Sequence, residues 1–291
     1  MTAWLTGARI ILALVIATPA MAAEEDFLRL QHLLRLAEKP PEKATAKDHI
    51  YFKNDIAFCT GESDLARENN HAAEMMESGD YEGAADHLNR VLKNASLFFP
   101  FRYNLGTCYF HLNLLSRSLL HYGKAQAVVP EYAGTYLRIG AIYQLQYRDH
   151  EAIESYREAL RVNRKELNTY VLIGDLFFDR NQLQLAKKYY DTCLRIDHRF
   201  NNALLGRAKI HFREGEYQKA MVSLKMVDTR KDFDIAYHYY YAEAAFKLRD
   251  YTAASKNYEI LLRHRADRFF LTHSVSLIER KLYLSNRFIQ E

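Results

Sequence analysis

Asp175 and Asp179 are the two carboxylates whose spacing best suits chemistry in this sequence. Residues four apart on a helix share one face, so the pair has the geometry to ligate a cation or to act as an acid and a base. No other reactive side chain converges on them in the sequence. We therefore interpret the pair as a solvated acidic patch in a binding groove.

The other reactive residue types follow no pattern typical of a site. None of the 12 histidines lies four residues from another histidine or from a cysteine, so no helical metal site is expected. The sequence contains no GxSxG, HExxH or P-loop motif, and no GxGxxG follows an expected strand. We expect no catalytic residue, metal or cofactor, and a protein that is not an enzyme.

The three cysteines, Cys59, Cys108 and Cys193, have no zinc-binding or CxxC spacing. We favour the interpretation that these cysteines are small, buried, apolar side chains on helices. The odd number leaves open whether one thiol pairs with another chain.

The elements that position these residues follow a period of 34 residues. With only 11 glycines and 5 prolines in 291 residues, the chain has too few turn residues for a many-stranded β-fold. A column of small residues recurs at this period: Ala72, Gly106, Gly140, Gly174, Ala208 and Ala242. A second small column lies twelve residues further on: Ala84, Ser118, Ala152, Ala186, Ala220 and Ala254.

Each period contains two amphipathic stretches separated by a short corner, which predicts an antiparallel helix pair. The small columns allow the two backbones to approach closely. A column of large residues fills the space that the small ones leave: Leu88, Tyr122, Tyr156, Tyr190, Leu224 and Tyr258.

This pattern resembles the tetratricopeptide repeat family, whose period is 34 residues. The sequence departs from the family in lacking the first-helix tryptophan, in having only Pro130 as a unit-ending proline, and in placing Arg207 and His211 in the fifth unit. The resemblance implies an all-α, right-handed α-solenoid of six helix-turn-helix repeats with flanking capping helices. The six units are 65–98, 99–132, 133–166, 167–200, 201–234 and 235–268.

The flanks are expected to be helical caps, because a stacked array leaves an apolar face bare at each end. Residues 23–64 form the N-terminal cap, with short helices predicted at 26–39 and 47–59. Residues 269–291 form the C-terminal cap, as one amphipathic helix over 269–290.

Residues 1–22 have the pattern of a signal peptide. Residues 10–17 are apolar, and Ala20-Met21-Ala22 is a small-x-small cleavage site. A retained anchor is the alternative, but the apolar run is well short of the ~20 residues that span a bilayer. We expect an exported, most simply periplasmic, chain with no stable membrane insertion after cleavage.

In this family the first helix of each unit lines the inner side of the solenoid. The inward positions carry a stripe of phenylalanines with charges that alternate in sign between units. The predicted groove residues are Tyr103, Phe110, Asp175, Phe178, Asp179, Lys209, Phe212, Arg213, Tyr239, Glu243 and Phe246. The alternative is that these aromatic side chains pack on the next unit or under the capping helix.

A net charge of +4, without a basic stripe, gives no reason to expect nucleic-acid binding. The main hypothesis is a scaffold of the bacterial cell envelope that holds a protein or peptide in its groove. The second is a self-assembling homo-oligomer that forms part of an envelope machine, such as a periplasmic flagellar sheath.

Overall fold

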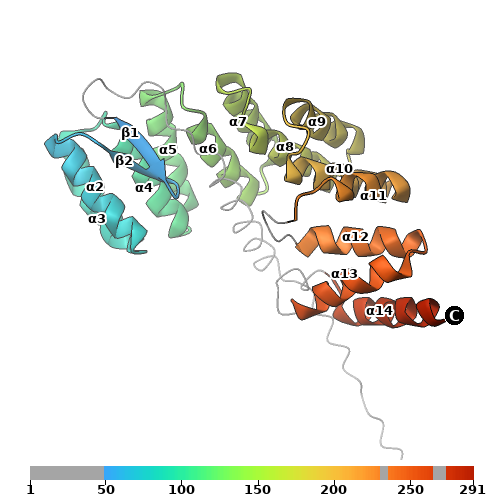
Figure 1. Cartoon of the computed structure of the whole chain (residues 1–291). Helices are drawn as coiled ribbons and strands as arrows, with labels where there is room; N and C mark the ends of the chain where they lie inside the picture. The colour runs from blue at the N-terminus through green and yellow to red at the C-terminus, as the bar shows by residue number, and fades with distance from the viewer. Residues whose placement is uncertain (1–48, 230–234, 265–272) are drawn as a thin grey trace, which may run out of the picture.

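The protein is an α-solenoid in which antiparallel helix pairs stack side by side (Figure 1). The computed structural model describes residues 49–229, 235–264 and 273–291. Its six pairs confirm the predicted fold class. The pairs are α2 (Asp64–Glu77) with α3 (Tyr81–Val91), α4 (Phe99–His111) with α5 (Leu115–Val128), α6 (Ala133–Leu145) with α7 (Asp149–Val162), α8 (Leu167–Asp179) with α9 (Leu183–Ile196), α10 (Asn201–Arg213) with α11 (Tyr217–Lys225), and α12 (Ile235–Lys247) with α13 (Tyr251–Arg263). A single 3-10 turn, η1 (Leu92–Asn94), follows α3.

The corner inside each pair is made by one residue with a positive φ. Such a residue ends the first helix in the left-handed conformation that directs the chain back along it. Glycine adopts this conformation most easily, and asparagine next. The six corner residues are Gly79, Asn113, Tyr147, Asn181, Gly215 and Arg249, with φ between 57° and 89°.

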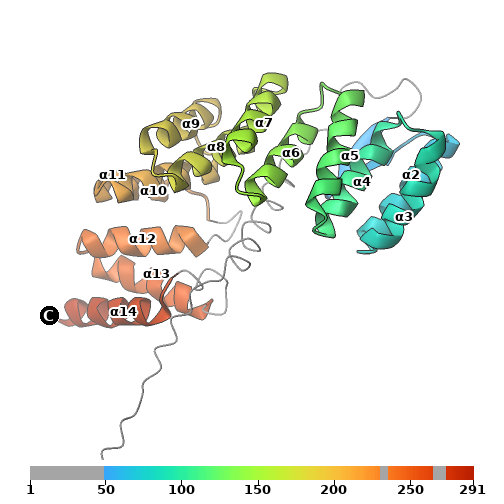
Figure 2. The same ribbon diagram turned by 180° about the vertical axis from the view of Figure 1, so that it is seen from behind.

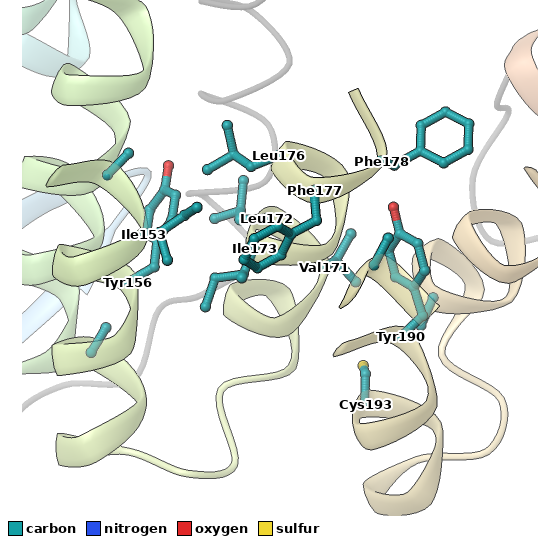
Figure 3. Packing of buried hydrophobic residues seen from close by; sticks show 14 of the residues in the cluster. Ile153, Tyr156, Val171, Leu172, Ile173, Leu176, Phe177, Phe178, Tyr190 and Cys193 are labelled. Carbon is teal, nitrogen blue, oxygen red and sulfur yellow. The ribbon is translucent and has the colours of Figure 1, made fainter. Parts of the chain in front are cut away.

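Packing inside the pairs depends on contacts between the small column and tyrosine. A Cβ added to Gly140 would lie 2.5 Å from Cε1 of Tyr156, and one added to Gly174 would lie 2.6 Å from Cε1 of Tyr190. Both tyrosines are fully buried. Figure 3 shows them on either side of Phe177 on α8. The predicted complementarity of the small and large columns is therefore confirmed in these units.

The N-terminal flank corrects one prediction. Residues 47–59 were expected to form a helix, but 50–59 form a β-hairpin of β1 (Ile50–Lys53) and β2 (Ile56–Cys59). Aromatic and β-branched residues favour strands, and Asn54-Asp55, with φ of 49° and 65°, form the tight two-residue turn that asparagine and aspartate favour. The apolar residues instead lie on both faces of the hairpin, with Ile56 and Phe58 in one core cluster and Ile50, Ala57 and Cys59 in another.

At the other end, α14 (Val275–Gln290) packs on α13 through buried Ile278. It begins later than the predicted start at residue 269, because Ser274 is its N-cap and accepts a hydrogen bond from the Leu277 amide. The predicted signal peptide (1–22), the predicted helix 26–39 and residues 269–272 lie outside the described residues. Within the described part, none of the helices has the length and apolar character to span a bilayer.

All three cysteines are buried, as the spacing indicated. Cys108 and Cys193 lie on helices, whereas Cys59 lies on β2. Burial raises the pKa of the Cys108 and Cys193 thiols to about 12, so both stay protonated at neutral pH.

We predict opposite effects for two glycine-to-alanine substitutions. Gly140→Ala forces a methyl group against the Tyr156 ring and should lower the free energy of unfolding by about 1–3 kcal/mol. Gly123→Ala, on α5, meets no atom within 4 Å and should raise it by about 0.5–1 kcal/mol, because alanine is the better helix former. Urea denaturation followed by circular dichroism measures both. Equal destabilisation by the two changes would contradict the glycine–tyrosine account.

Candidate binding groove along the first helices

The hairpin fills the N-terminal part of the predicted groove. It lies against α2 and α4, and Figure 2 shows it behind the α4–α5 pair. Three side chains that bind the hairpin come from consecutive units. Each occupies the sixth position of its 34-residue unit, which lies on the first helix. These residues are Asn70, Asn104 and Arg138, and they bind Cys59, Ala57 and Asp55 respectively. Each successive helix pair therefore binds the residue that lies two positions earlier in the extended segment.

Asparagine side chains bind the backbone along the outer edge of β2. The amides of Ala57 and Cys59 donate to Oδ1 of Asn104 and Asn70, both at 2.8 Å. The two Nδ2 groups donate back to the carbonyls of the same residues at 2.8 and 2.7 Å. In an antiparallel pair, every second residue directs its N–H and C=O away from the partner strand. The asparagines satisfy these groups and bind the strand through its backbone.

An aspartate at the turn anchors the tip of the hairpin. Asp55 pairs with Arg138 and accepts a hydrogen bond from the Tyr103 hydroxyl at 2.6 Å, and all three residues are buried. Burial lowers the pKa of the Arg138 guanidinium, but Asp55 together with Tyr103 and Tyr122 acts in the opposite direction, so the pKa is raised overall. Burial, with Asp55 adding to it, raises the pKa of Tyr103. Arg138 therefore remains charged beside its counter-ion.

Five of the predicted groove residues are buried among the protein's own side chains. Tyr103 and Phe110 lie in the core next to the hairpin. Asp175 accepts a hydrogen bond from the Tyr190 hydroxyl at 2.6 Å, which corrects the interpretation of this carboxylate as part of a solvated patch. Glu243 binds Lys281 of α14 and the Tyr258 hydroxyl. Phe178 is 6% exposed under the guanidinium of Arg213.

The other six predicted residues lie at least partly at the surface of the last three units. Asp179 and Arg213 are exposed, whereas Lys209, Phe212, Tyr239 and Phe246 are half-buried. Arg213 lies 4.2 Å from the centre of the Phe178 ring. The Phe212 ring packs edge-on against Tyr217 and Tyr240, and the Lys209 ammonium lies 6.0 Å from the Tyr240 ring centre.

Aromatic rings and cations of α8, α10 and α12 therefore lie together in one part of the predicted groove, which we call the C-terminal groove: Phe178, Asp179, Lys209, Phe212, Arg213 and Tyr240. Tyr239 and Phe246 lie nearer the C-terminal cap, where Tyr239 contacts His273 and Phe246 contacts Tyr251. A role for any of these residues in partner binding stays a prediction.

Comparison with protein families identifies the repeats. Two tetratricopeptide repeat models match, one over residues 70–134 and the other over 133–166 and 167–198. The chain carries tetratricopeptide repeats. The TPR matches span the first to fourth helix pairs, and the structure shows that pairs five and six continue the array. A comparison with curated proteins finds no match.

Solved structures share this arrangement of helices. PilW, a widely conserved type IV pilus biogenesis factor, is 17% identical with a TM-score of 0.58, over 74% of this chain and 99% of PilW. PilF of Pseudomonas aeruginosa is 18% identical with a TM-score of 0.60, over 68% and 90%. A TPR protein from Parabacteroides merdae is 16% identical with a TM-score of 0.58, over 75% and 97%. At these identities the likeness shows the fold alone.

We predict that Asn104→Ala releases the hairpin and exposes Cys59 to alkylation. The change removes the hydrogen bonds of Asn104 with Ala57 and leaves a buried amide unsatisfied, at a cost of about 2 kcal/mol, so Cys59 labelling should accelerate on the order of 30-fold. Mass spectrometry of iodoacetamide-treated native protein measures each cysteine separately.

Two controls accompany this experiment. Cys193 should label at the wild-type rate, and Asn257→Ala, which removes an asparagine from α13, should leave Cys59 protected. Unchanged labelling of Cys59 in Asn104→Ala would show that the asparagine does not hold the hairpin.

Proposed function

We propose that this TPR protein is a non-enzymatic interaction scaffold that binds an extended segment of a partner protein in the C-terminal groove. TPR proteins act in general as protein-interaction scaffolds, and exposed apolar surface rimmed by charge suits peptide binding. The docked hairpin is the observation that carries the proposal: the same wall of first helices binds an extended segment of the chain itself through side-chain amides and an arginine.

The two halves of the wall differ in chemistry. In the first three units the sixth-position residues are asparagine, asparagine and arginine, which bind backbone and an acidic side chain. In the last three they are Leu172 and Gly206, which are buried in the protein's own core, and Tyr240, which is half-buried. Lys209 and Arg213 add cations beside the aromatic rings of Tyr240 and Phe178. We therefore propose a partner segment with apolar side chains and at least one carboxylate directed at Arg213.

We further propose that the scaffold works in the bacterial cell envelope. The pattern of residues 1–22 supports export, because a short apolar run precedes a small-x-small cleavage site. Cleavage after Ala22 would release a chain with Ala23 as its first residue. Periplasmic partners would then have direct access to the groove.

One in-cell crosslinking experiment tests both parts of the proposal. A photo-reactive amino acid replaces Phe212 in the C-terminal groove, or Lys188 on the exposed face of α9, and crosslinked protein is extracted by osmotic shock. We expect a partner to crosslink from position 212 and not from 188, on chains that begin at Ala23. Arg213→Glu should reduce that crosslink about tenfold, whereas Lys188→Glu should not.

The outcomes separate the alternatives. Equal crosslinking from both positions, or no effect of Arg213→Glu, would contradict the groove assignment. Crosslinks to a second copy of the chain would instead support the self-assembling component. Retention of the complete chain in the cytoplasmic fraction would contradict the envelope location.

A further inference from the structure

The corner between α10 and α11 differs from the other corners in its donor groups. Three side chains bring metal-ligating atoms together here: His211, Glu214 and Glu216. The His211 Nδ1 atom lies 2.8 Å from a carboxylate oxygen of Glu216 and 3.9 Å from one of Glu214. Their ligand atoms all lie within 4.8 Å of one another. His211 is buried, whereas both glutamates reach the surface.

The repeat register makes this cluster unusual within the chain. His211 occupies the eleventh position of its unit, where the second, third and fourth units have Tyr109, Tyr143 and Phe177. Positions 14 and 16 of the same unit are Glu214 and Glu216. The equivalent pairs in the other units are Ser78/Asp80, Leu112/Leu114, Gln146/Arg148, Arg180/Gln182 and Leu248/Asp250. The fifth unit alone in this register combines an imidazole with two carboxylates at its corner.

We propose that His211, Glu214 and Glu216 bind a divalent transition-metal ion of the Zn²⁺ type. One imidazole nitrogen and two carboxylate oxygens are donors that suit Zn²⁺, and three protein ligands leave coordination positions for water. Mg²⁺ and Ca²⁺ prefer oxygen ligands, so a site with an imidazole ligand suits them less well. An ion held at about 2.0–2.2 Å from each donor requires only side-chain adjustment, since the donors already lie within 4.8 Å of one another.

The ligands come from three consecutive pieces of the corner, which gives the ion a structural effect. His211 lies in the last turn of α10, Glu214 is its C-cap and Glu216 is the N-cap of α11. A bound ion would therefore fix the angle between the two helices of the fifth unit. It would do so beside Phe212 and Arg213, which lie between the ligands in the sequence.

One cation already competes for the cluster. The Lys219 ammonium lies 2.7 Å from Oε1 of Glu216. An incoming Zn²⁺ must displace this ammonium or share the carboxylate with it. Removing the lysine charge should therefore strengthen metal binding, an effect that a purely structural ion-pair network would not produce.

Calorimetric titration of the full, tag-free chain with Zn²⁺ tests the proposal, and the Co²⁺ visible spectrum reports the ligand set. We expect one site in the wild type that is lost in His211→Tyr, a variant that places the aromatic residue of other units at this position and should keep the fold. Glu214→Gln should weaken binding at least about tenfold, and Lys219→Met should tighten it. Glu158→Gln, a surface carboxylate on α7, is the matched control.

Thermal unfolding provides a second readout. Saturating Zn²⁺ should raise the midpoint of the wild type and leave that of His211→Tyr unchanged, because binding to the folded state alone is stabilising. If His211→Tyr does not fold, the double change Glu214→Gln with Glu216→Gln replaces it. Zn²⁺ binding with equal affinity to the wild type and these variants, or no binding by the wild type, would overturn the proposal.

Discussion

The close approach of two backbones at glycine, with a buried tyrosine filling the remaining space, is the constraint on which this solenoid depends. Gly106, Gly140 and Gly174 each have no room for a Cβ beside the tyrosine of their own helix pair. The ring of Tyr190 also limits Gly206 in the following pair, so the same contact acts within and between units. Because these contacts set the helix spacing, they also set the spacing of the side chains on the inner wall.

That regular spacing explains how the wall binds its own N-terminal segment. Asn70, Asn104 and Arg138 follow one another at 34-residue intervals, and the residues they bind follow one another at two-residue intervals. Backbone recognition by amides needs an extended segment and makes few demands on its side chains. The ion pair of Asp55 with Arg138 fixes the position of the strand along the helices, because a slip of the strand would leave both charges buried without partners.

Much of the fold could be predicted from the sequence, because its repeats encode local packing. The small and large columns identified the helix pairs and their mutual contact. The hairpin was missed because residues 47–59 have apolar spacings compatible with a helix, although the Asn54-Asp55 turn and the aromatic and β-branched residues around it were the available signals. Whether a side chain faces solvent or a docked segment of the chain depends on the tertiary structure. Tyr103 and Phe110 were therefore predicted to line an open groove that the hairpin fills.

The residues at the sixth position of each unit were also not predicted to bind a segment of the chain. The asparagines at residues 70 and 104 gave no signal on their own, since polar residues on a helix are ordinarily solvated. His211 stood out in the sequence as a departure from the repeat. Its relation to Glu214 and Glu216 was not predicted, because a helical metal site is expected from histidine spaced four residues from another histidine or from a cysteine. The three residues span a helix end, a corner and the next helix, and only the corner geometry brings them together.

The central claim is that the inner wall binds an extended backbone through side-chain amides, and hydrogen exchange of the Ala57 and Cys59 amides tests it most directly. These two N–H groups bond to Asn104 and Asn70 rather than to β1, so pairing within the hairpin cannot protect them. The account predicts slow exchange for both, comparable with amides in the middle of α4. Exchange at the rate of an exposed loop, with α4 still protected, would contradict it.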